Sequence, residues 1–503
     1  MPNTTLNRRR FLGSLGLTAA ALACPKSLLS AVQAAPRVGQ GKPLKRKPNV
    51  ILILSDDVGL DDIGCYGGGF KTPHIDALAA GGTRFEYCYS SPLCGPSRAE
   101  LLTGRYAFRT GMESNATGDV MKPANETMLP RVLKPAGYVT ASVGKWNQLP
   151  LQPGDWGFDE YFRFGGSGVY WKGNVAPGAK PKAGAAPKAG GKARPKAQAR
   201  ANYTANGVTR PIPEDVYVPD MMHDFLADFI TRHKDQPFFA YYPMSHMHGK
   251  IVPTPDHPDT VGPRKLYADN IAYMDKLVGK LVALLDQLGL REDTLIIFTG
   301  DNGTAQGEAN FGTLDGERIN GQKNTMKEGG SRVPLIANWK GTTPAGKVNH
   351  DLTDFSDFMP TLAQLASAPL PTEKPIDGHS FLPQIKGEVG NPREWVYVEL
   401  SGNRYVRDAK WKLNNAGELY DMKKAPIQEI LVPATTTDPA AIAARAHLQT
   451  VMDNLVGKNA PPPTPLKNQN KGQKAQNGQK AQRAQKRANK AARKQRRLGK
   501  IAA

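Results

Sequence analysis

The stretch NVILILSDDVG, residues 49–59, joins an uninterrupted apolar run to two aspartates and a glycine. The run from Asn49 to Leu54 has the length of a strand, and its branched side chains leave no polar face, as in a strand covered on both sides. A second stretch, DTLIIFTGDNG (residues 293–303), repeats this pattern and again ends in an acidic residue and a glycine. Two such runs predict the centre of a buried, largely parallel sheet.

The sequence before the second run predicts a helix that covers this sheet. Apolar residues recur at helical spacing between Tyr267 and Leu288, namely at Ile271, Met274, Leu277, Val278, Leu281, Leu284 and Leu285. Near the C-terminus, residues 395–400 and 404–413 predict short strands of an antiparallel sheet. We therefore expect an α/β fold with a mixed sheet sandwiched by helices, followed by a smaller C-terminal antiparallel sheet with a helix.

Oxygen-bearing side chains follow both apolar runs. Asp56 and Asp57 come directly after the first run, and Asp301 and Asn302 follow the second. Because ligands gather at the carboxyl ends of strands in open α/β sheets, we expect these four residues to meet. Their donors are all oxygens, which favours Ca²⁺, with Mg²⁺ as the alternative ion, over zinc. Either pair alone is equally typical of a turn, and the presence of both favours a metal site.

Three segments account for the net charge of +21. Residues 1–49, 172–200 and 461–503 carry nine, eight and thirteen of the 66 Lys and Arg residues and no Asp or Glu, which leaves 36 basic against 45 acidic residues elsewhere. The globular part is therefore acidic overall. Low hydrophobicity predicts that the basic insert (172–201) and the basic tail (460–503) are disordered. The tail either solubilises the protein or binds a polyanion.

The first 35 residues predict export. Three consecutive arginines from Arg8 precede an apolar stretch that ends at Ala23. This stretch is far shorter than the roughly 20 residues that a membrane span needs, so it indicates a signal peptide (1–35) followed by a linker (36–48). The arginines resemble a twin-arginine signal, with general secretion as the alternative. We expect a bacterial periplasmic or extracellular protein without a transmembrane segment in the mature chain.

The stretch CGPSRAELLTG, residues 94–104, resembles the C-x-P-S-R-x-x-x-L-T-G signature of the sulfatase family at every fixed position. The resemblance covers most of residues 49–425 and includes Thr72-Pro73-His74-Ile75-Asp76, Gly144-Lys145-Trp146, Gly321-Gln322-Lys323, Glu328-Gly329-Gly330-Ser331-Arg332-Val333-Pro334, Trp411-Lys412-Leu413 and Glu418-Leu419-Tyr420-Asp421. It implies a formylglycine-dependent, type I sulfatase with an alkaline-phosphatase-like catalytic domain (49–385) and a C-terminal subdomain (386–459).

The resemblance also implies a role for each matching residue. Cys94 would be oxidised to formylglycine before folding, so the reactive group would be an aldehyde hydrate rather than a thiol. Asp56, Asp57, Asp301 and Asn302 would hold Ca²⁺, with the modified residue at position 94 as a further ligand.

Cationic residues complete the implied site. Arg98 would support the charge of the hydrate, while Lys145 and Lys323 would bind sulfate oxygens. One hydroxyl of the hydrate would attack sulfur, and the alcohol would leave with a proton from a nearby acid. Loss of a proton from the second hydroxyl would then expel sulfate and restore the aldehyde.

Two positions depart from the family pattern or add to it. After Gly-Lys-Trp the family has a histidine, implied to be the base of the second step, whereas this chain has Asn147, whose amide cannot act as a base. Residues 238–248, FFAYYPMSHMH, resemble the strand that delivers the leaving-group histidine, here His248, and His246 is additional. Residues two apart share one side of an extended strand, so we hypothesise that His246 replaces the absent base. The alternative is that Asn147 serves a different substrate geometry and His246 only lines the pocket.

Together these features predict an exported sulfuric ester hydrolase that cleaves carbohydrate or aryl sulfates. Its partners would be the sulfated substrate, the enzyme that converts Cys94 to formylglycine, and a polyanion attracted by the basic tail. A phosphonate monoester or phosphodiester hydrolase on the same scaffold is one alternative. A non-catalytic polyanion-binding protein is another, favoured only by Asn147. Cys65 and Cys88 either form one disulfide or remain buried thiols.

Overall fold

The computed structural model describes residues 46–115, 120–172 and 201–458. The predicted signal peptide, the basic tail and nearly all of the basic insert lie outside these residues. In the described part, no helix has both the length and the apolar character that crossing a membrane requires.

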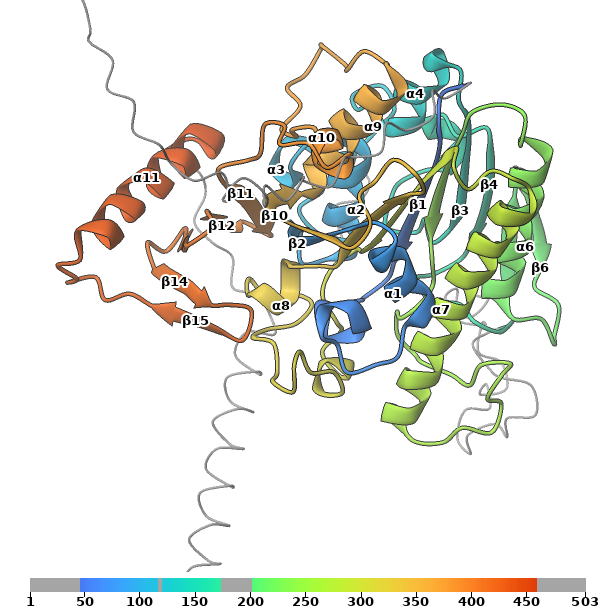
Figure 1. The fold of residues 1–503 in the computed structure, drawn as a ribbon, viewed down its shortest axis with the longest axis horizontal. Helices are drawn as coiled ribbons and strands as arrows, with labels where there is room; N and C mark the ends of the chain where they lie inside the picture. The colour runs from blue at the N-terminus through green and yellow to red at the C-terminus, as the bar shows by residue number, and fades with distance from the viewer. Residues whose placement is uncertain (1–45, 116–119, 173–200, 459–503) are drawn as a thin grey trace, which may run out of the picture. The chain divides into compact units, whose positions relative to one another are not determined.

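A ten-stranded mixed sheet forms the centre of the protein (Figure 1), with the order β10-β2-β9-β8-β1-β7-β3-β4-β5-β6. Its strands are β1 (Asn49–Ser55), β2 (Thr83–Tyr89), β3 (Val139–Gly144), β4 (Glu160–Phe164), β5 (Asn202–Ala205), β6 (Val208–Pro211), β7 (Phe238–Pro243), β8 (Thr294–Gly300), β9 (Leu335–Trp339) and β10 (Lys347–Asp354). The two predicted strands are β1 and β8, which are parallel neighbours. β7 flanks β1 on its other side and is also parallel to it.

The helices connect and cover these strands. The α-helices are α1 (Pro73–Ala80), α2 (Cys94–Thr103), α3 (Ala107–Thr110), α4 (Leu129–Leu133), α6 (Val218–Arg232), α7 (Pro263–Gln287), α8 (Glu328–Ser331), α9 (Phe358–Ala366), α10 (Leu382–Ile385) and α11 (Pro439–Val456). Short 3₁₀ helices are η1 (Leu60–Asp62), η2 (Gly64–Tyr66), η4 (Lys134–Ala136), η5 (Pro153–Trp156), η7 (Glu308–Asn310) and η8 (Phe355–Asp357).

Alternate side chains of β1 enter two separate hydrophobic clusters. Ile51 and Ile53 pack in one cluster with residues of α1, α6 and α7. Val50, Leu52 and Leu54 pack in the other with residues of α2, α4 and α9. Helices therefore cover both faces of the sheet, which explains why the β1 run has no polar face and confirms the predicted sandwich.

The predicted covering helix is α7, which begins with Pro263 at a position where proline is well tolerated. Of its seven predicted apolar positions, all but Leu284 are fully buried, and Leu284 packs against the edge of the same cluster. The helical spacing therefore identified the face of α7 that meets the sheet.

A second, antiparallel sheet follows, with the strands β11 (Val396–Leu400), β12 (Asn403–Arg407), β13 (Trp411–Asn414), β14 (Leu419–Lys424) and β15 (Gln428–Leu431). Residues 404–413, taken from the sequence as one stretch, belong to two of these strands. The Asp408 carboxylate accepts hydrogen bonds from the N–H groups of Lys410 and Trp411 (2.7 and 2.6 Å) and turns the chain between them. Apolar residues of α11 pack on this sheet. The domain boundary near residue 385 stays a prediction.

The C-terminal sheet holds the segment 320–328 in place. The Asn320 N–H donates to the Pro426 carbonyl (2.8 Å), and the Glu328 N–H donates to the Glu429 carboxylate (2.9 Å). Between them, the Lys412 ammonium donates to the Met326 carbonyl (2.9 Å). Because this segment contains Lys323, the second sheet helps to position a predicted site residue.

Candidate active site

The carboxyl ends of β1 and β8 bring the predicted acidic residues together. The two strands stay in register to their last residues, so the chain emerges from both at one edge of the sheet. Ligand atoms of Asp56, Asp57, Cys94 and Asp301 all lie within 4.8 Å of one another. All four side chains are buried. The sequence prediction that these strand ends meet is therefore confirmed.

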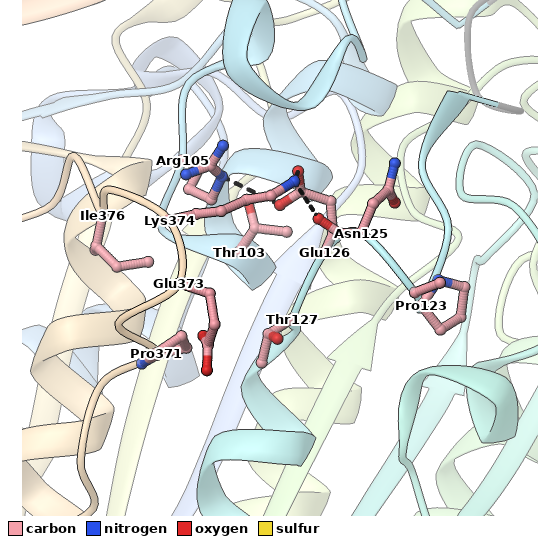
Figure 2. A pocket seen from close by; sticks show the side chains of 11 residues that line it. Thr103, Arg105, Pro123, Asn125, Glu126, Thr127, Pro371, Glu373, Lys374 and Ile376 are labelled. Atoms are coloured by element: carbon pink, nitrogen blue, oxygen red, sulfur yellow. Dashed lines mark hydrogen bonds and ion pairs between the residues drawn. The ribbon is translucent and has the colours of Figure 1, made fainter.

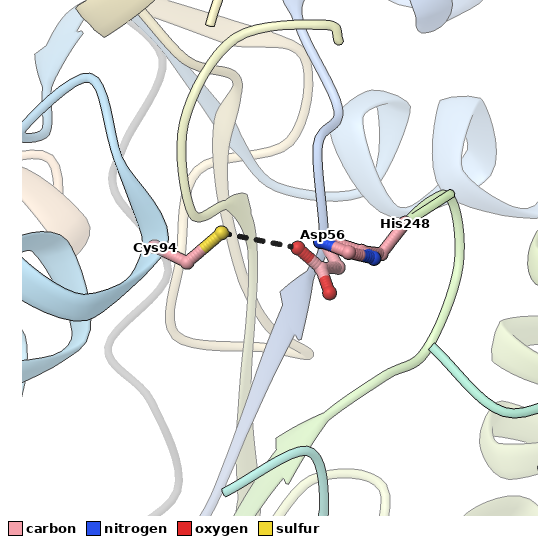
Figure 3. A group of neighbouring side chains, drawn as sticks. All are labelled: Asp56, Cys94 and His248. Atoms are coloured by element: carbon pink, nitrogen blue, oxygen red, sulfur yellow. Dashed lines mark hydrogen bonds between the residues drawn. The ribbon is translucent and has the colours of Figure 1, made fainter. Parts of the chain in front are cut away.

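Cys94 is the first residue of α2 and faces this cluster. Its Sγ lies 3.6 Å from Asp56 Oδ1 and 3.8 Å from Asp57 Oδ1, and Figure 3 shows the sulfur directed at Asp56. Burial and the charge of Asp301 raise the pKa of the Cys94 thiol far above its usual value. A thiol that stays protonated is a weak nucleophile, and its sulfur is a poor ligand for a hard cation.

Each carboxylate of the cluster pairs with a different cationic side chain: Asp301 with Arg98 (2.7 Å), Asp56 with Lys145 (2.5 Å), and Asp57 with Lys323. These cations come from three separate places in the fold, namely α2, the residue after β3, and the segment held by the C-terminal sheet. The predicted cationic residues thus all reach the acidic cluster.

Burial and ion pairing act on the three carboxylates in opposite directions. Burial raises the pKa of Asp56 well above its usual range, and its paired ammonium offsets this only in part. Burial also acts upward on Asp57 and Asp301, but the nearby charges of Lys323 and Arg98 outweigh it, so the pKa values of both carboxyls lie below their usual range. The last two are therefore held ionised.

His248 lies in the turn after β7 and approaches the same cluster (Figure 3). Its ring nitrogen, Cys94 Sγ and a carboxylate oxygen of Asp56 lie within 4.8 Å of one another. Burial, assisted by the charge of Lys145, lowers the pKa of His248 to about 3. The imidazole is therefore neutral and offers one N–H donor and one acceptor beside residue 94.

His246 occupies a different environment. β7 ends at Pro243, so the extended-strand geometry that would place His246 beside His248 does not continue to these residues. The fully buried His246 ring lies 5.4, 6.2 and 6.2 Å, between ring centroids, from Tyr170, Tyr217 and Tyr273. Its Nε2 is 3.2 Å from the Tyr217 hydroxyl. These contacts place the His246 ring in an aromatic environment inside the protein.

Asn147 is exposed beyond the end of β3. In the amide orientation that satisfies both partners, Nδ2 donates to the Phe164 carbonyl (3.1 Å) and Oδ1 accepts from the Gly166 N–H. Both polar atoms of the side chain thus bond the backbone of the loop that follows β4.

Two further polar groups at the site were not identified from the sequence. Asn115 Oδ1 accepts a hydrogen bond from the Gly95 N–H (2.8 Å) beside Cys94, and the Ser97 hydroxyl donates to the Asp301 carbonyl. Ser97 lies inside the CGPSRAELLTG motif, which already indicated that this segment is near the strand ends. Asn115 had no such indication, because its position depends on the path of a loop.

Asn302 presents a buried oxygen without a partner. Its Nδ2 donates to Asp57 Oδ1 and to the Gly303 carbonyl (both 2.9 Å), while Oδ1 has no hydrogen-bond partner among the described residues. A buried acceptor without a donor costs free energy, which a cation would offset. Together with the three carboxylates, this oxygen makes a donor set that fits a hard divalent cation.

A cavity of about 250 Å³ lies at the opposite end of α2 from Cys94 (Figure 2). Glu126 forms ion pairs there with Arg105 (3.1 Å) and Lys374 (3.2 Å). None of the predicted site residues lines this cavity. Cys65 and Cys88 are free thiols; Cys88 is buried, as the second of the two cysteine alternatives has it, whereas Cys65 is only partly buried.

Comparisons with known proteins agree with this fold. The sulfatase family model matches residues 48–368. Arylsulfatase A of Homo sapiens is 34% identical over 410 residues, which cover 78% of this chain and 78% of that protein. N-acetylgalactosamine-6-sulfatase of Canis lupus familiaris is 35% identical over 380 residues, which cover 72% of this chain and 70% of that protein.

Two solved structures are also similar. The crystal structure of Ps i-CgsB in complex with k-i-k-neocarrahexaose has a TM-score of 0.70 at 27% identity and covers 85% of this chain and 96% of that one. The PsFucS1 sulfatase from Pseudoalteromonas sp. has a TM-score of 0.63 at 26% identity and covers 84% of this chain and 92% of that one. The fold is alkaline-phosphatase-like, and the chain belongs to the sulfatase family. It is an enzyme of the sulfuric ester hydrolase class.

Proposed function

We propose that this enzyme hydrolyses carbohydrate or aryl sulfate esters with a formylglycine at position 94 and a bound Ca²⁺ ion, Mg²⁺ being the alternative. The observation that carries the proposal is the Cys94 side chain, which points from the start of α2 into a cluster of buried carboxylates. As a protonated thiol, Cys94 is unsuited to attack. Conversion to an aldehyde hydrate would supply a hydroxyl nucleophile and a second hydroxyl for release of sulfate.

The metal would be held by Asp56, Asp57, Asp301 and Asn302, together with the modified residue 94. It would lower the pKa of the attacking hydroxyl and stabilise negative charge on the reacting group. With the metal bound, all three carboxylates would be ionised and would together balance the charges of Arg98, Lys145 and Lys323. A divalent cation would therefore leave the site with a positive surplus, which attracts an anionic sulfate ester.

The cationic side chains divide the remaining tasks. Lys145 and Lys323 carry ammonium groups next to residue 94 that can donate hydrogen bonds to sulfate oxygens. Arg98 holds the Asp301 carboxylate through its Nε and Nη2 atoms (3.0 and 2.7 Å) and so fixes a metal ligand. His248 can donate to the ester oxygen of the leaving alcohol. The hypothesis that His246 acts in the second step stays a prediction, and unchanged sulfate release by His246→Ala would reject it.

The names of the similar proteins support the substrate class, since they include an arylsulfatase, an N-acetylgalactosamine-6-sulfatase and a protein in complex with a neocarrahexaose. Cys94 is fully buried in the folded chain. The enzyme that converts Cys94 to formylglycine would therefore have to act before the catalytic domain folds. Export by residues 1–35 also stays a prediction, because those residues lie outside the described part.

Matched substrates test the proposal. Protein made with and without a formylglycine-generating enzyme should be assayed with 4-nitrophenyl sulfate, a sulfated monosaccharide and bis(4-nitrophenyl) phosphate. We expect sulfate ester hydrolysis to scale with the formylglycine fraction and Cys94→Ala to be inactive. Faster turnover of the phosphodiester than of the aryl sulfate by fully converted protein would favour the phosphodiesterase alternative instead.

A further inference from the structure

One loop, residues 164–170, lies between Asn147 and the turn that carries His248. It starts at the last residue of β4, and β4 lies beside β3, which in turn lies beside β7. All three strands are parallel, so the residues after each one emerge at the same edge of the sheet. The loop therefore has access both to the residues after β3 and to the turn after β7.

Two consecutive side chains after β3 bond this loop. Asn147 holds the Phe164 carbonyl and the Gly166 N–H, as described above. Gly166 has φ +89°, a backbone conformation that favours glycine. Gln148 adds a third bond, because its Nε2 donates to the Ser167 hydroxyl (2.5 Å). An amide suits this place because it presents a donor and an acceptor side by side.

The other end of the loop packs on the backbone of His248. A Cβ added to Gly168 would lie 2.6 Å from the His248 carbonyl oxygen, so loop and turn are in direct contact there. The Tyr170 hydroxyl bonds the carbonyls of His248 (3.1 Å) and Ser245 (3.0 Å). The Ser245 hydroxyl in turn donates to the Val169 carbonyl (3.4 Å). A shift of the loop would therefore displace the turn that presents the His248 imidazole.

We propose that Asn147 and Gln148 are positioning residues that fix residues 164–168 against the His248 turn and so set the place of its imidazole at the leaving-group oxygen. This rests on the proposed function, in which His248 serves the leaving alcohol. The family has a histidine at this position, whose implied role is proton transfer. Asn147 instead has a positioning role, because it holds the neighbouring loop. Its direct contacts are with the loop, and its effect on substrate passes through His248.

Leaving-group dependence tests the proposal with a readout that general damage would not produce. A sugar alcohol needs a proton or a hydrogen bond as it leaves, whereas 4-nitrophenolate needs little help. For Asn147→Ala we expect kcat on a sulfated monosaccharide to fall by about tenfold, a part of what a general acid contributes, and kcat on 4-nitrophenyl sulfate to change by less than about twofold. Asn147→Asp keeps the acceptor for Gly166 and should give an intermediate loss.

The chain offers a matched control. Asn415 also bonds one carbonyl and one N–H of the backbone, those of Gly402 (2.9 Å) and Arg404 (3.3 Å), but in the C-terminal sheet. Asn415→Ala should leave the ratio of the two rates unchanged. Gln148→Ala and Ser167→Ala should each lower the sugar-sulfate rate, and the double variant should lose no more than the larger single loss, because both remove one hydrogen bond.

Hydrogen exchange separates this inference from the proposed function. Backbone amides of residues 164–168 should exchange faster in Asn147→Ala than in the wild type. This measurement does not depend on whether the enzyme is active. Equal losses on both substrates, or unchanged exchange in this segment, would overturn the positioning role while leaving the sulfatase proposal intact. An inactive but fully converted wild type would instead reject the proposed function.

Discussion

Lys145 and Lys323 both approach the acidic cluster, but they differ in access. The side chain of Lys145 is fully buried against Asp56, whereas the side chain of Lys323 is 11% exposed to solvent. Lys323 is therefore the more accessible of the two lysine side chains. Its partner Asp57 would be shared with the metal, so the lysine keeps donors for sulfate.

Replacing Lys323 tests its role in binding sulfate. A hydrogen bond from a charged donor contributes about 1.5–3 kcal/mol, so Lys323→Met should lower kcat/KM for 4-nitrophenyl sulfate by roughly 10- to 150-fold. Lys327→Met is a matched control, since Lys327 belongs to the same segment but pairs with Glu429 (3.5 Å). Equal rates for Lys323→Met and the wild type would contradict the sulfate-binding role.

At the residue scale, the sequence located the chemistry but not the partners of each group. Asp56, Asp57, Asp301 and Asn302 were placed correctly at one edge of the sheet because parallel strand ends must meet there. The partners of Asn147 could not be predicted, because they belong to a loop whose path depends on tertiary contacts. The same limit applies to His246. Its expected place beside His248 required the strand to continue to residue 248, whereas β7 ends at Pro243.

Among the secondary-structure elements, the ends of β1 and β8 concentrate three buried carboxylates and one buried amide oxygen that has no hydrogen-bond partner in the described part of the chain. Removing a bound divalent cation should therefore destabilise this edge of the sheet as well as stop turnover. We expect excess chelator to lower Tm by about 5 °C, the order of effect for a ligand held well above its Kd. Added Ca²⁺ should restore both Tm and activity. Full activity of metal-free protein, verified by elemental analysis, would rule out the metal site.

A pH effect is expected at β11. Burial raises the pKa of Glu399 from 4.5 to about 7, despite a hydrogen bond from Tyr397, and Glu113 and Arg404 are the nearby charges. The folded protein therefore keeps a proton that the unfolded chain has lost, and stability falls as pH rises from about 4.5 to 7. Glu399→Gln removes this dependence, so at pH 8 we expect the variant to be more stable by on the order of 2 kcal/mol.

The same variant should differ little from the wild type near pH 4, where the wild-type carboxyl is largely protonated in both the folded and the unfolded state. Denaturant unfolding at both pH values measures the effect, and Glu394→Gln, on an exposed residue, controls for lost surface charge. Identical stability differences at the two pH values would show that the Glu399 carboxyl is not buried as described.

At the element scale, periodicity predicted the long elements best. β1, β8 and α7 bury almost every apolar position that the sequence indicated, because one repeating face is enough to fix them. Residues 404–413 were harder, since the break between β12 and β13 depends on one side-chain cap, that of Asp408. Such a local hydrogen bond leaves no periodic pattern in the sequence.

For the whole molecule, charge is distributed unevenly between the acidic globular part and the basic tail. Deleting residues 461–503 removes thirteen of the 66 basic residues. At low salt we expect binding to an immobilised sulfated polysaccharide to weaken by at least about tenfold and to become less dependent on salt. The rate on 4-nitrophenyl sulfate should not change. A tail of equal length with Gln in place of Lys and Arg separates charge from length, and unchanged polysaccharide binding by it would reject the proposed attraction.

Because the catalytic proposal depends on the chemical identity of residue 94, the most direct test is tandem mass spectrometry of the tryptic peptide Phe85 to Arg98. The protein should be purified from its own host. We expect the residue at position 94 to have lost its sulfur and to carry an aldehyde oxygen. Active native protein in which Cys94 is entirely an unmodified thiol would contradict the formylglycine mechanism. The only group at position 94 that could attack the ester would then be a buried, protonated thiol.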